Sequence, residues 1–361
     1  MTSAHYAPAE PDPAKVEAFA GRMLDVLNSA SIAGLASIGH QAGLFDVMAA
    51  MPPSSSEQIA RAADLDERYV REWLAGLVTG GIIDYDPATL TYALPPERAA
   101  LLTRDAGPDN LAFFAQYIAL FGTVEQKLLE CFRHGGGLTY ADYPRFQALQ
   151  REETAAIYDA SLLERTIPSI GGLAQQLTAG VEVADIGCGS GHALNLLARA
   201  FPKSSFTGYD ISEEAIAAAR AEADQWGLTN ATFVIQDVAR LDLAASYDFI
   251  MAFDAIHDQV VPRTVLANIR RALRPGGTFL MVDFNVSSNL EEQGGHPLAP
   301  SIYLASFFHC MTVSLAHGGE GLGAMWGQQK ALEYLAEAGF GNVEIKEVEG
   351  DMLNAYYICR T

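Results

Sequence analysis

Three glycines at alternate positions mark the stretch VADIGCGSGHA, residues 183–193. An apolar run that ends in Asp185 comes directly before them. A strand-to-helix turn of this composition lets the backbone adopt dihedral angles that are closed to other residues, and it leaves amide N–H groups free to face a ligand. The turn at Gly187, Gly189 and Gly191 therefore predicts a site for a small molecule.

Acids also end the next two apolar runs, at Asp210 in SSFTGYD and at Asp237 in ATFVIQD. Because a carboxylate offers two acceptor oxygens, Asp210 is placed to take both hydroxyls of a ribose. An acid that merely caps the following helix is the alternative, but it does not explain three such acids in succession. The nicotinamide fingerprint Gly-x-Gly-x-x-Gly would need glycine where His192 stands, so NAD is not expected.

Two histidines are candidates for proton transfer. His257 in YDFIMAFDAIHD follows a predicted strand, and His309 lies in SFFHCMTVSL. Near a hydroxyl or phenol, either could act as a general base. The alternatives are that His257 only packs on a bound ligand and that His309 is a buried histidine with satisfied hydrogen bonds. His192 is expected to cap a helix or to face solvent.

Composition narrows the class of protein. The 361 residues carry a net charge of −21, which disfavours a polyanionic partner such as nucleic acid. No apolar run approaches a membrane span and no signal peptide is seen, so we expect a cytoplasmic protein. The cysteines are far apart, which predicts free thiols and no metal site; they are Cys131, Cys188, Cys310 and Cys359.

Strand and helix patterns divide the chain. From residue 181 onward, apolar strands alternate with helices of ten to fifteen residues, which predicts a doubly wound, Rossmann-like α/β sheet. Residues 15–104 read as helices followed by a hairpin, the order of a winged helix. Residues 1–14 are expected to be a disordered arm, and residues 105–180 to form a helical linker and cap.

The motifs in the second half resemble, in order, those of class I S-adenosylmethionine-dependent methyltransferases. They comprise Asp-x-Gly-x-Gly-x-Gly, the strand-end acids, YDFIMAFDAIHD and LRPGGTFLMVDF. The resemblance implies a seven-stranded sheet with an antiparallel last strand over residues 181–361, S-adenosylmethionine as cofactor and S-adenosylhomocysteine as product. It implies cofactor contacts at Asp185, Gly187, Cys188, Gly189, Gly191, Asp210, Ile211, Gln236, Asp237, Val238, Phe253, Asp254 and His257.

Within this resemblance, Asp237 would contact the adenine amino group, the Val238 amide a ring nitrogen, and Phe253 and Asp254 the region of the methyl group. The whole chain resembles small-molecule methyltransferases whose N-terminal domain mediates dimerisation, and in detail an uncharacterised bacterial group with FDAIHDQ and HCMTVSLA. A homodimer through residues 16–135 is therefore expected, also because LAFFAQYIALFG is too apolar for a monomer's surface.

The sequence says least about the molecule that would accept the methyl group. Residues 285–326 form an insertion with an apolar, aromatic centre, which we interpret as a lid over a pocket for a small, largely apolar acceptor, O-methylation being favoured. Packing on the front domain is the alternative. The predicted lining is Tyr303, Phe307, Phe308 and Met311 of this segment, and Tyr143 and Phe146 are expected to close the pocket from the front domain.

Two other functions stay open. A protein that binds S-adenosylmethionine with lost or altered transferase chemistry would carry the same motifs. A winged-helix DNA-binding regulator is disfavoured because residues 54–102 hold eight acids against four arginines, which would repel phosphates.

Overall fold

The computed structural model describes residues 10–351 and 353–361. The chain forms two compact units, which meet in sequence between Ala119 and Leu120. Most of the predicted N-terminal arm, residues 1–9, lies outside the described residues. Its last two residues already belong to helix α1 (Pro13–Gln41), where the Asp12 side chain accepts a hydrogen bond from the amide of Ala14 and so caps the helix.

The first unit has the winged-helix order that the sequence predicts. After α1 come α2 (Leu44–Ala49), α3 (Ser56–Ala63), α4 (Glu67–Thr79), the antiparallel pair β1 (Asp84–Asp86) and β2 (Thr91–Ala93), α5 (Pro96–Leu102) and the 3-10 turn η1 (Arg104–Asp109). A capping box between Ser55 and Gln58 starts α3. Trp73 and Leu77 of α4 are buried in the core of this unit, whereas Tyr69 on the same helix is exposed.

Helices precede the sheet of the second unit. Helix α6 (Leu111–Gly122) runs across the sequence boundary between the units and is followed by α7 (Glu125–His134), the turn η2 (Tyr140–Asp142) and α8 (Phe146–Ser161). A π-helical turn η3 (Leu162–Thr166), a short α9 (Ile167–Ser169) and α10 (Leu173–Ala179) lead to the first strand. These segments carry residues that approach the candidate site.

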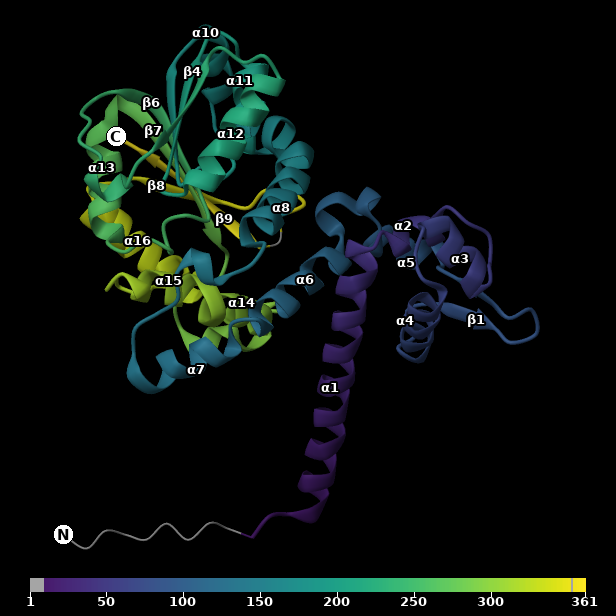
Figure 1. Cartoon of the computed structure of the whole chain (residues 1–361). Helices are drawn as coiled ribbons and strands as arrows, with labels where there is room; N and C mark the ends of the chain where they lie inside the picture. Colours follow the sequence, from purple (N-terminus) through teal and green to yellow (C-terminus); the bar gives the residue numbers. More distant parts are fainter. Residues whose placement is uncertain (1–9, 352) are drawn as a thin grey trace, which may run out of the picture. The chain divides into compact units, whose positions relative to one another are not determined.

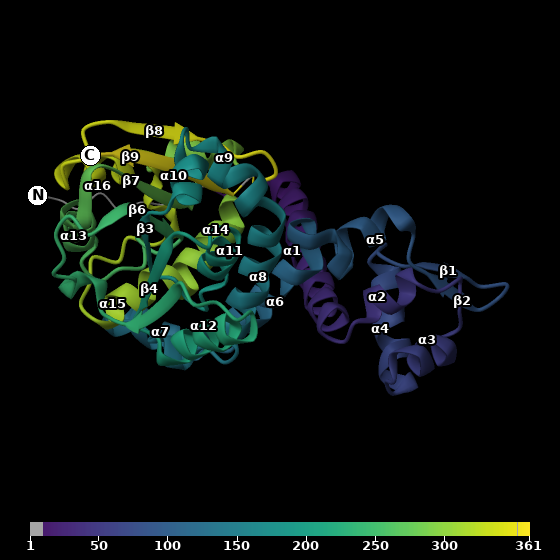
Figure 2. The ribbon, with the colours of Figure 1, turned by 90° about the horizontal axis from the view of Figure 1, so that it is seen from above.

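The second unit is built on one seven-stranded sheet in the order β5-β4-β3-β6-β7-β9-β8 (Figures 1 and 2). Its first strands run parallel, and β9 pairs antiparallel with both β7 and β8. This confirms the predicted Rossmann-like sheet with an antiparallel last strand. The strands are β3 (Glu182–Ile186), β4 (Ser205–Asp210), β5 (Ala231–Ile235), β6 (Tyr247–Phe253), β7 (Leu273–Phe284), β8 (Val343–Lys346) and β9 (Asn354–Arg360).

Helices cover both faces of this sheet (Figure 2). On one face α10, α11 (His192–Ala200) and α12 (Glu213–Gln225) bury a core that includes Leu194 and Phe249. On the other face α13 (Pro262–Ala272) and α16 (Gly327–Glu337) pack over a second core that includes Phe279 and Tyr334. A parallel sheet needs such cover on both faces, because its strands are apolar on both sides.

The segment predicted to be a lid contains one long interrupted helix. It consists of α14 (Ala299–Ala305), the π-helical turn η6 (Ser306–Cys310) and α15 (Met311–Ala316), with 3-10 turns η5 (Leu290–Gly295) before it and η7 (Ala324–Trp326) after it. Residues 299–316 are, among the described helices, the one stretch long and apolar enough to cross a membrane, with a mean hydropathy of 1.2. Because 44% of this stretch is buried inside the protein, we interpret it as a packed helix of the domain.

Candidate active site

The glycine loop connects β3 to α11, and its three glycines have φ values of 72°, 53° and 72°. A Cβ atom at Gly187 would lie 2.6 Å from the Cβ of Ala255, and one at Gly191 would lie 2.5 Å from the ring of Phe233. At Gly189, by contrast, no described atom lies within 4 Å of the Cβ position. The protein's own packing therefore excludes side chains at two of the glycines, and Gly189 is the one that faces open space.

The segments predicted to hold the cofactor all lie at one edge of the sheet. The glycine loop follows β3, Asp210 and Ile211 lie at the end of β4, residues 236–238 follow β5, and residues 253–254 end β6. Because these four strands are parallel, their carboxyl ends meet at the same edge, where doubly wound sheets bind ligands. The thiol of Cys188 lies half-buried in the loop, and Ile211 is exposed.

Asp210 ties the glycine loop to β4. Its Oδ2 accepts a hydrogen bond from the amide of Gly189 at 2.8 Å, and its Oδ1 accepts one from the amide of Ser212 at 2.8 Å. Burial raises the pKa of Asp210, and these amide bonds oppose the shift. Each carboxylate oxygen keeps acceptor capacity for a further donor, so both could still receive ribose hydroxyls.

Asp185 is a buried carboxyl with an unsatisfied oxygen. Its residue is 2% exposed, and no hydrogen-bond partner among the described residues reaches Oδ1. Burial, together with the charge of Asp210, raises the pKa of Asp185 to about 8. A buried charge without a partner is costly, so this carboxyl fits a ligand that brings a cationic group to the loop.

The remaining strand ends are partly engaged within the protein. Asp237 accepts a hydrogen bond from the amide of Ala239 at 3.0 Å and lies 3.3 Å from Nε of Arg240, while the Gln236 side chain donates to the carbonyl of Asp237. Val238, whose amide the family resemblance assigns to adenine, is itself buried.

At the end of β6, Phe253 and Asp254 lie next to helix α8. The rings of Phe253 and Tyr158 have centroids 4.9 Å apart. Asp254 has a positive φ of 49°. A non-glycine residue in this backbone conformation is uncommon and is found at functional sites. Tyr158 was not expected from the sequence.

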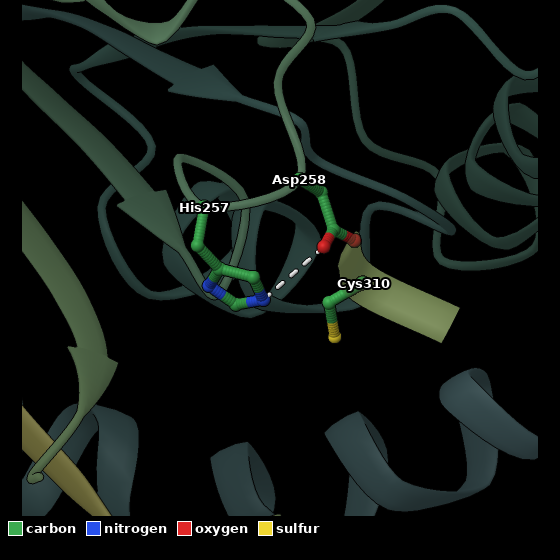
Figure 3. A group of neighbouring side chains, drawn as sticks. All are labelled: His257, Asp258 and Cys310. Carbon is green, nitrogen blue, oxygen red and sulfur yellow. Dashed lines mark ion pairs between the residues drawn. The ribbon is translucent and has the colours of Figure 1, made fainter. Parts of the chain in front are cut away.

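His257 lies between two carboxylates. Its Nδ1 is 2.9 and 3.0 Å from the two oxygens of Asp283, and its Nε2 is 3.3 Å from Oδ1 of Asp258 (Figure 3). Burial alone would lower the pKa of His257, but the charges of Asp283 and Asp258 outweigh it and raise this pKa. Asp283 was missed in the sequence, although it too is an acid near the end of a strand.

His309 belongs to an aromatic cluster. Its ring stacks on Phe146 at a centroid distance of 3.9 Å and contacts the rings of Tyr143 and Tyr140 edge-on. Burial lowers the pKa of His309 to about 4, so the ring is neutral, and its Nε2 has no hydrogen-bond partner among the described residues. The hydroxyl of Tyr140 donates to Asp258 at 3.3 Å, which links this cluster to His257.

The six predicted acceptor-lining residues separate into three pairs. Tyr143 and Phe146 are buried with His309 and belong to the second unit, not to the front domain. Tyr303 and Phe307 are 40% and 38% exposed, and Phe307 contacts Phe132. Of the other two, Phe308 stacks on Phe121 and Met311 is half-buried.

The sequence led us to expect that His192 caps a helix or faces solvent, but in the structure this residue is largely buried. It is the first residue of α11 and is 9% exposed. Its Nδ1 lies 2.8 Å from a carboxylate oxygen of Glu222 on α12, and its Nε2 lies 3.2 Å from one of Asp159 on α8. The two acids come from distant segments, so sequence spacing could not reveal that they hold this histidine.

Family comparisons agree with the fold. Residues 177–339 match the model of a methyltransferase domain, and residues 30–104 match the model of an Rv2258c-like winged HTH domain. The chain thus combines a winged HTH domain with a methyltransferase domain, which defines its class as a methyltransferase-fold protein with an N-terminal winged helix.

The individual relatives that we compared match only part of this chain. The chain is 33% identical over 107 residues to a malonyl-[acyl-carrier protein] O-methyltransferase of Bacillus cereus, covering 30% of this chain and 39% of the relative. It is 28% identical over 183 residues to the S-adenosyl-L-methionine-dependent Diels-Alderase iccD of Talaromyces variabilis, covering 49% of this chain and 59% of the relative. The chain therefore matches less than two thirds of the length of either relative.

A solved structure, PigF with SAH, shares the fold over nearly the whole chain. The TM-score is 0.69 at 20% sequence identity, covering 95% of this chain and 98% of PigF. At this identity the likeness concerns the fold alone.

Proposed function

We propose that the second unit binds S-adenosylmethionine and transfers its methyl group to an oxygen of a small, largely apolar acceptor. The observation that carries this proposal is the buried carboxyl of Asp185, whose Oδ1 has no hydrogen-bond partner among the described residues, beside a glycine loop whose Gly189 faces open space. S-adenosylmethionine carries an ammonium and a sulfonium group, and these cations suit a site lined with buried acids. The cofactor would supply an electrophilic methyl group on sulfur.

The strand-end residues would hold this cofactor. Asp210 would accept the ribose hydroxyls, Asp237 and the Val238 amide would contact the adenine, and Asp185 would face the ammonium group. Phe253 and Asp254 would lie near the sulfonium.

His257 would serve as the general base. Asp283 fixes the ring by accepting a hydrogen bond from Nδ1–H, so Nε2 is the nitrogen that can take the proton of the methyl acceptor. In the structure Nε2 faces Asp258, and this contact must open before the acceptor hydroxyl can bind there. His309 stays neutral and offers Nε2 as a hydrogen-bonding group, while the rings of Tyr143 and Phe146 keep water away.

Replacing Asp210 with Ala should weaken cofactor binding by about 1.5 kcal/mol or more, roughly tenfold in Kd, since each hydrogen bond to a charged group contributes about that much. The loss should be larger if the Gly189 amide, which Asp210 also holds, becomes mobile. Isothermal titration calorimetry with S-adenosylhomocysteine measures this loss of affinity. Asp224→Ala, an exposed acid on α12, is the matched control, and unchanged affinity in Asp210→Ala would remove Asp210 from the site.

A cofactor-binding protein with altered chemistry is the second candidate. One relative is named as an S-adenosyl-L-methionine-dependent Diels-Alderase, so a related sequence is associated with another reaction. Incubation with methyl-labelled cofactor and a panel of phenols, carboxylic acids, amines and thiols separates the two functions. Transfer of label supports methylation, whereas tight cofactor binding without any transfer supports altered chemistry.

We further propose that the winged-helix unit mediates a homodimer and does not bind DNA. Two arginines of α4 are already paired on their own helix, Arg68 with Glu72 and Arg71 with Glu67, and are less available to phosphates. Helix α1 exposes apolar side chains at coiled-coil spacing, which a partner helix would bury. These are Val16, Phe19, Met23, Leu24, Val26 and Leu27.

Light scattering should therefore give about twice the chain mass of 38.8 kDa. Phe19→Glu should shift the mass toward that of the monomer, because it places a charge on the apolar face of α1. Leu290→Glu, an equally drastic change at an exposed residue of the second unit, should leave the mass unchanged. A wild-type mass of 38.8 kDa at micromolar concentration would refute the dimer.

A cytoplasmic location is also proposed. The four cysteines are free thiols in the structure, as the sequence predicts. Unpaired thiols suit a reducing compartment.

A further inference from the structure

The proposed base and two neighbouring side chains bring metal-ligating atoms to one place (Figure 3). The ring nitrogen of His257, a carboxylate oxygen of Asp258 and the sulfur of Cys310 all lie within 4.8 Å of one another. His257 and Cys310 are buried, and Asp258 is half-buried. His257 and Asp258 follow β6, whereas Cys310 ends the π-helical turn η6. Because Cys310 is distant from them in the sequence, the spacing of the cysteines did not reveal this group.

The spacing of two donors already matches a tetrahedral site. Nε2 of His257 and Oδ1 of Asp258 are 3.3 Å apart. Metal–nitrogen and metal–oxygen bonds of about 2.0 Å at tetrahedral angles place neighbouring donors roughly 3.3 Å apart. The sulfur needs a slightly larger separation from them, about 3.5 Å at a zinc–sulfur bond of about 2.3 Å, and in the structure it lies within 4.8 Å of both.

Two further observations point to a ligand at this position. Oδ1 of Asp258 is buried and, among the residues that the structure describes, has no hydrogen-bond partner, only the ion-pair contact with His257. Behind His257, both oxygens of Asp283 face Nδ1. A carboxylate that holds the far nitrogen of a histidine is the usual outer partner of a histidine that binds metal, because it fixes the ring and its tautomer.

We propose that His257, Asp258 and Cys310 form a binding site for one thiophilic divalent cation of the zinc type. Mixed nitrogen, oxygen and sulfur donors suit this class of ion, and three protein ligands leave a fourth position for water. On binding, the thiol of Cys310 releases its proton to solvent, and His257 binds through the lone pair on Nε2 of its neutral ring. The two negative ligands, one carboxylate and one thiolate, then balance the charge of the cation, as a buried site requires.

The site has a consequence for catalysis that depends on the proposed function. A cation on Nε2 occupies the lone pair with which His257 would accept the acceptor's proton. Metal binding and general-base catalysis therefore exclude one another, and the metal-bound protein should be inactive as a methyltransferase until the metal is removed.

Cobalt(II) is the probe for the site, because a thiolate ligand gives Co²⁺ an intense charge-transfer absorption in the near ultraviolet. The full-length, tag-free protein is treated with a chelator and titrated with CoCl₂, and Zn²⁺ is then added as competitor. We expect the charge-transfer band to saturate at one equivalent and to disappear when Zn²⁺ is added. Cys310→Ser should abolish the band, whereas Cys131→Ser, at a half-buried thiol of α7, should retain it.

The affinity for Zn²⁺ provides a second measurement. Cys310→Ser should weaken it by more than the roughly 10- to 100-fold that loss of an outer partner costs, and Asp283→Asn should fall within that range. Absence of the cobalt band in wild-type protein, or its persistence in Cys310→Ser, would overturn the site. Circular dichroism and binding of S-adenosylhomocysteine verify that each variant is folded.

The experiments distinguish a failure of the metal-site proposal from a failure of the methyltransferase proposal. Cobalt absorption needs neither cofactor nor acceptor, so it reports on the metal site even if no methyl transfer is found. Where an acceptor is known, activity should fall in proportion to Zn²⁺ bound and return with chelator. Stimulation by Zn²⁺, or inhibition that is equal in wild type and Cys310→Ser, would contradict the proposed exclusion.

Discussion

Replacing His257 with Ala is expected to lower kcat by roughly 10²- to 10⁴-fold, the contribution typical of a positioned general base. The affinity for S-adenosylmethionine should change little, since the ring is proposed to act on the acceptor. Steady-state kinetics on the acceptor with the highest turnover, with chelator present, measure the loss. His317→Ala, an exposed histidine after α15, is the matched control, and equal activity of both variants would remove His257 from the chemistry.

The two acids beside His257 should act differently. Asp283→Asn should also lower kcat, because an amide no longer selects the tautomer with the proton on Nδ1. Asp258→Asn should instead move the acidic limb of the pH–rate profile to lower pH. The base must be neutral, the charge of Asp258 raises the pKa of His257, and removing this charge lowers that pKa. An upward shift of the limb, or no effect of Asp283→Asn, would contradict these roles.

Cofactor binding is expected to depend strongly on pH through Asp185. Burial and the charge of Asp210 raise the pKa of Asp185 to about 8, so its carboxyl is mainly protonated in the free protein at neutral pH. A cationic ligand favours the ionised form, and binding must therefore release a proton. The affinity for S-adenosylmethionine should rise about tenfold per pH unit between about pH 5.5 and 7, where the cofactor's ammonium stays protonated.

Calorimetry in buffers with different ionisation enthalpies measures the released proton directly. Asp185→Asn should bind more weakly at pH 7 and should lose the pH dependence, whereas Asp224→Ala should keep it. The stability of the cofactor-free protein should change with pH in the direction opposite to that of the cofactor affinity. Because the folded pKa lies above the unfolded value of 3.8, the cofactor-free protein should lose stability as the pH rises from about 4 to about 8. A flat binding profile in wild type would refute the role of Asp185.

Local sequence determined the sheet and its binding edge. The alternation of apolar strands with helices predicts a doubly wound sheet, because each pattern reflects the face that an element buries. The glycine loop and the acids at the ends of β3, β4 and β5 follow from the same local information: each lies directly after an apolar strand, and parallel strands bring their ends together. For this reason the expected cofactor residues lie on one edge of the sheet.

The surroundings of individual side chains depended on tertiary structure. His192, expected to cap a helix or to face solvent, is held between acids from α8 and α12. Cys310, a scattered thiol in the sequence, lies beside His257. Tyr303 and Phe307 share the apolar segment of His309 but are exposed, while His309 is stacked on Phe146. Periodicity shows which face of an element is apolar. It does not show which distant segment covers that face, because that depends on long-range packing of the whole domain.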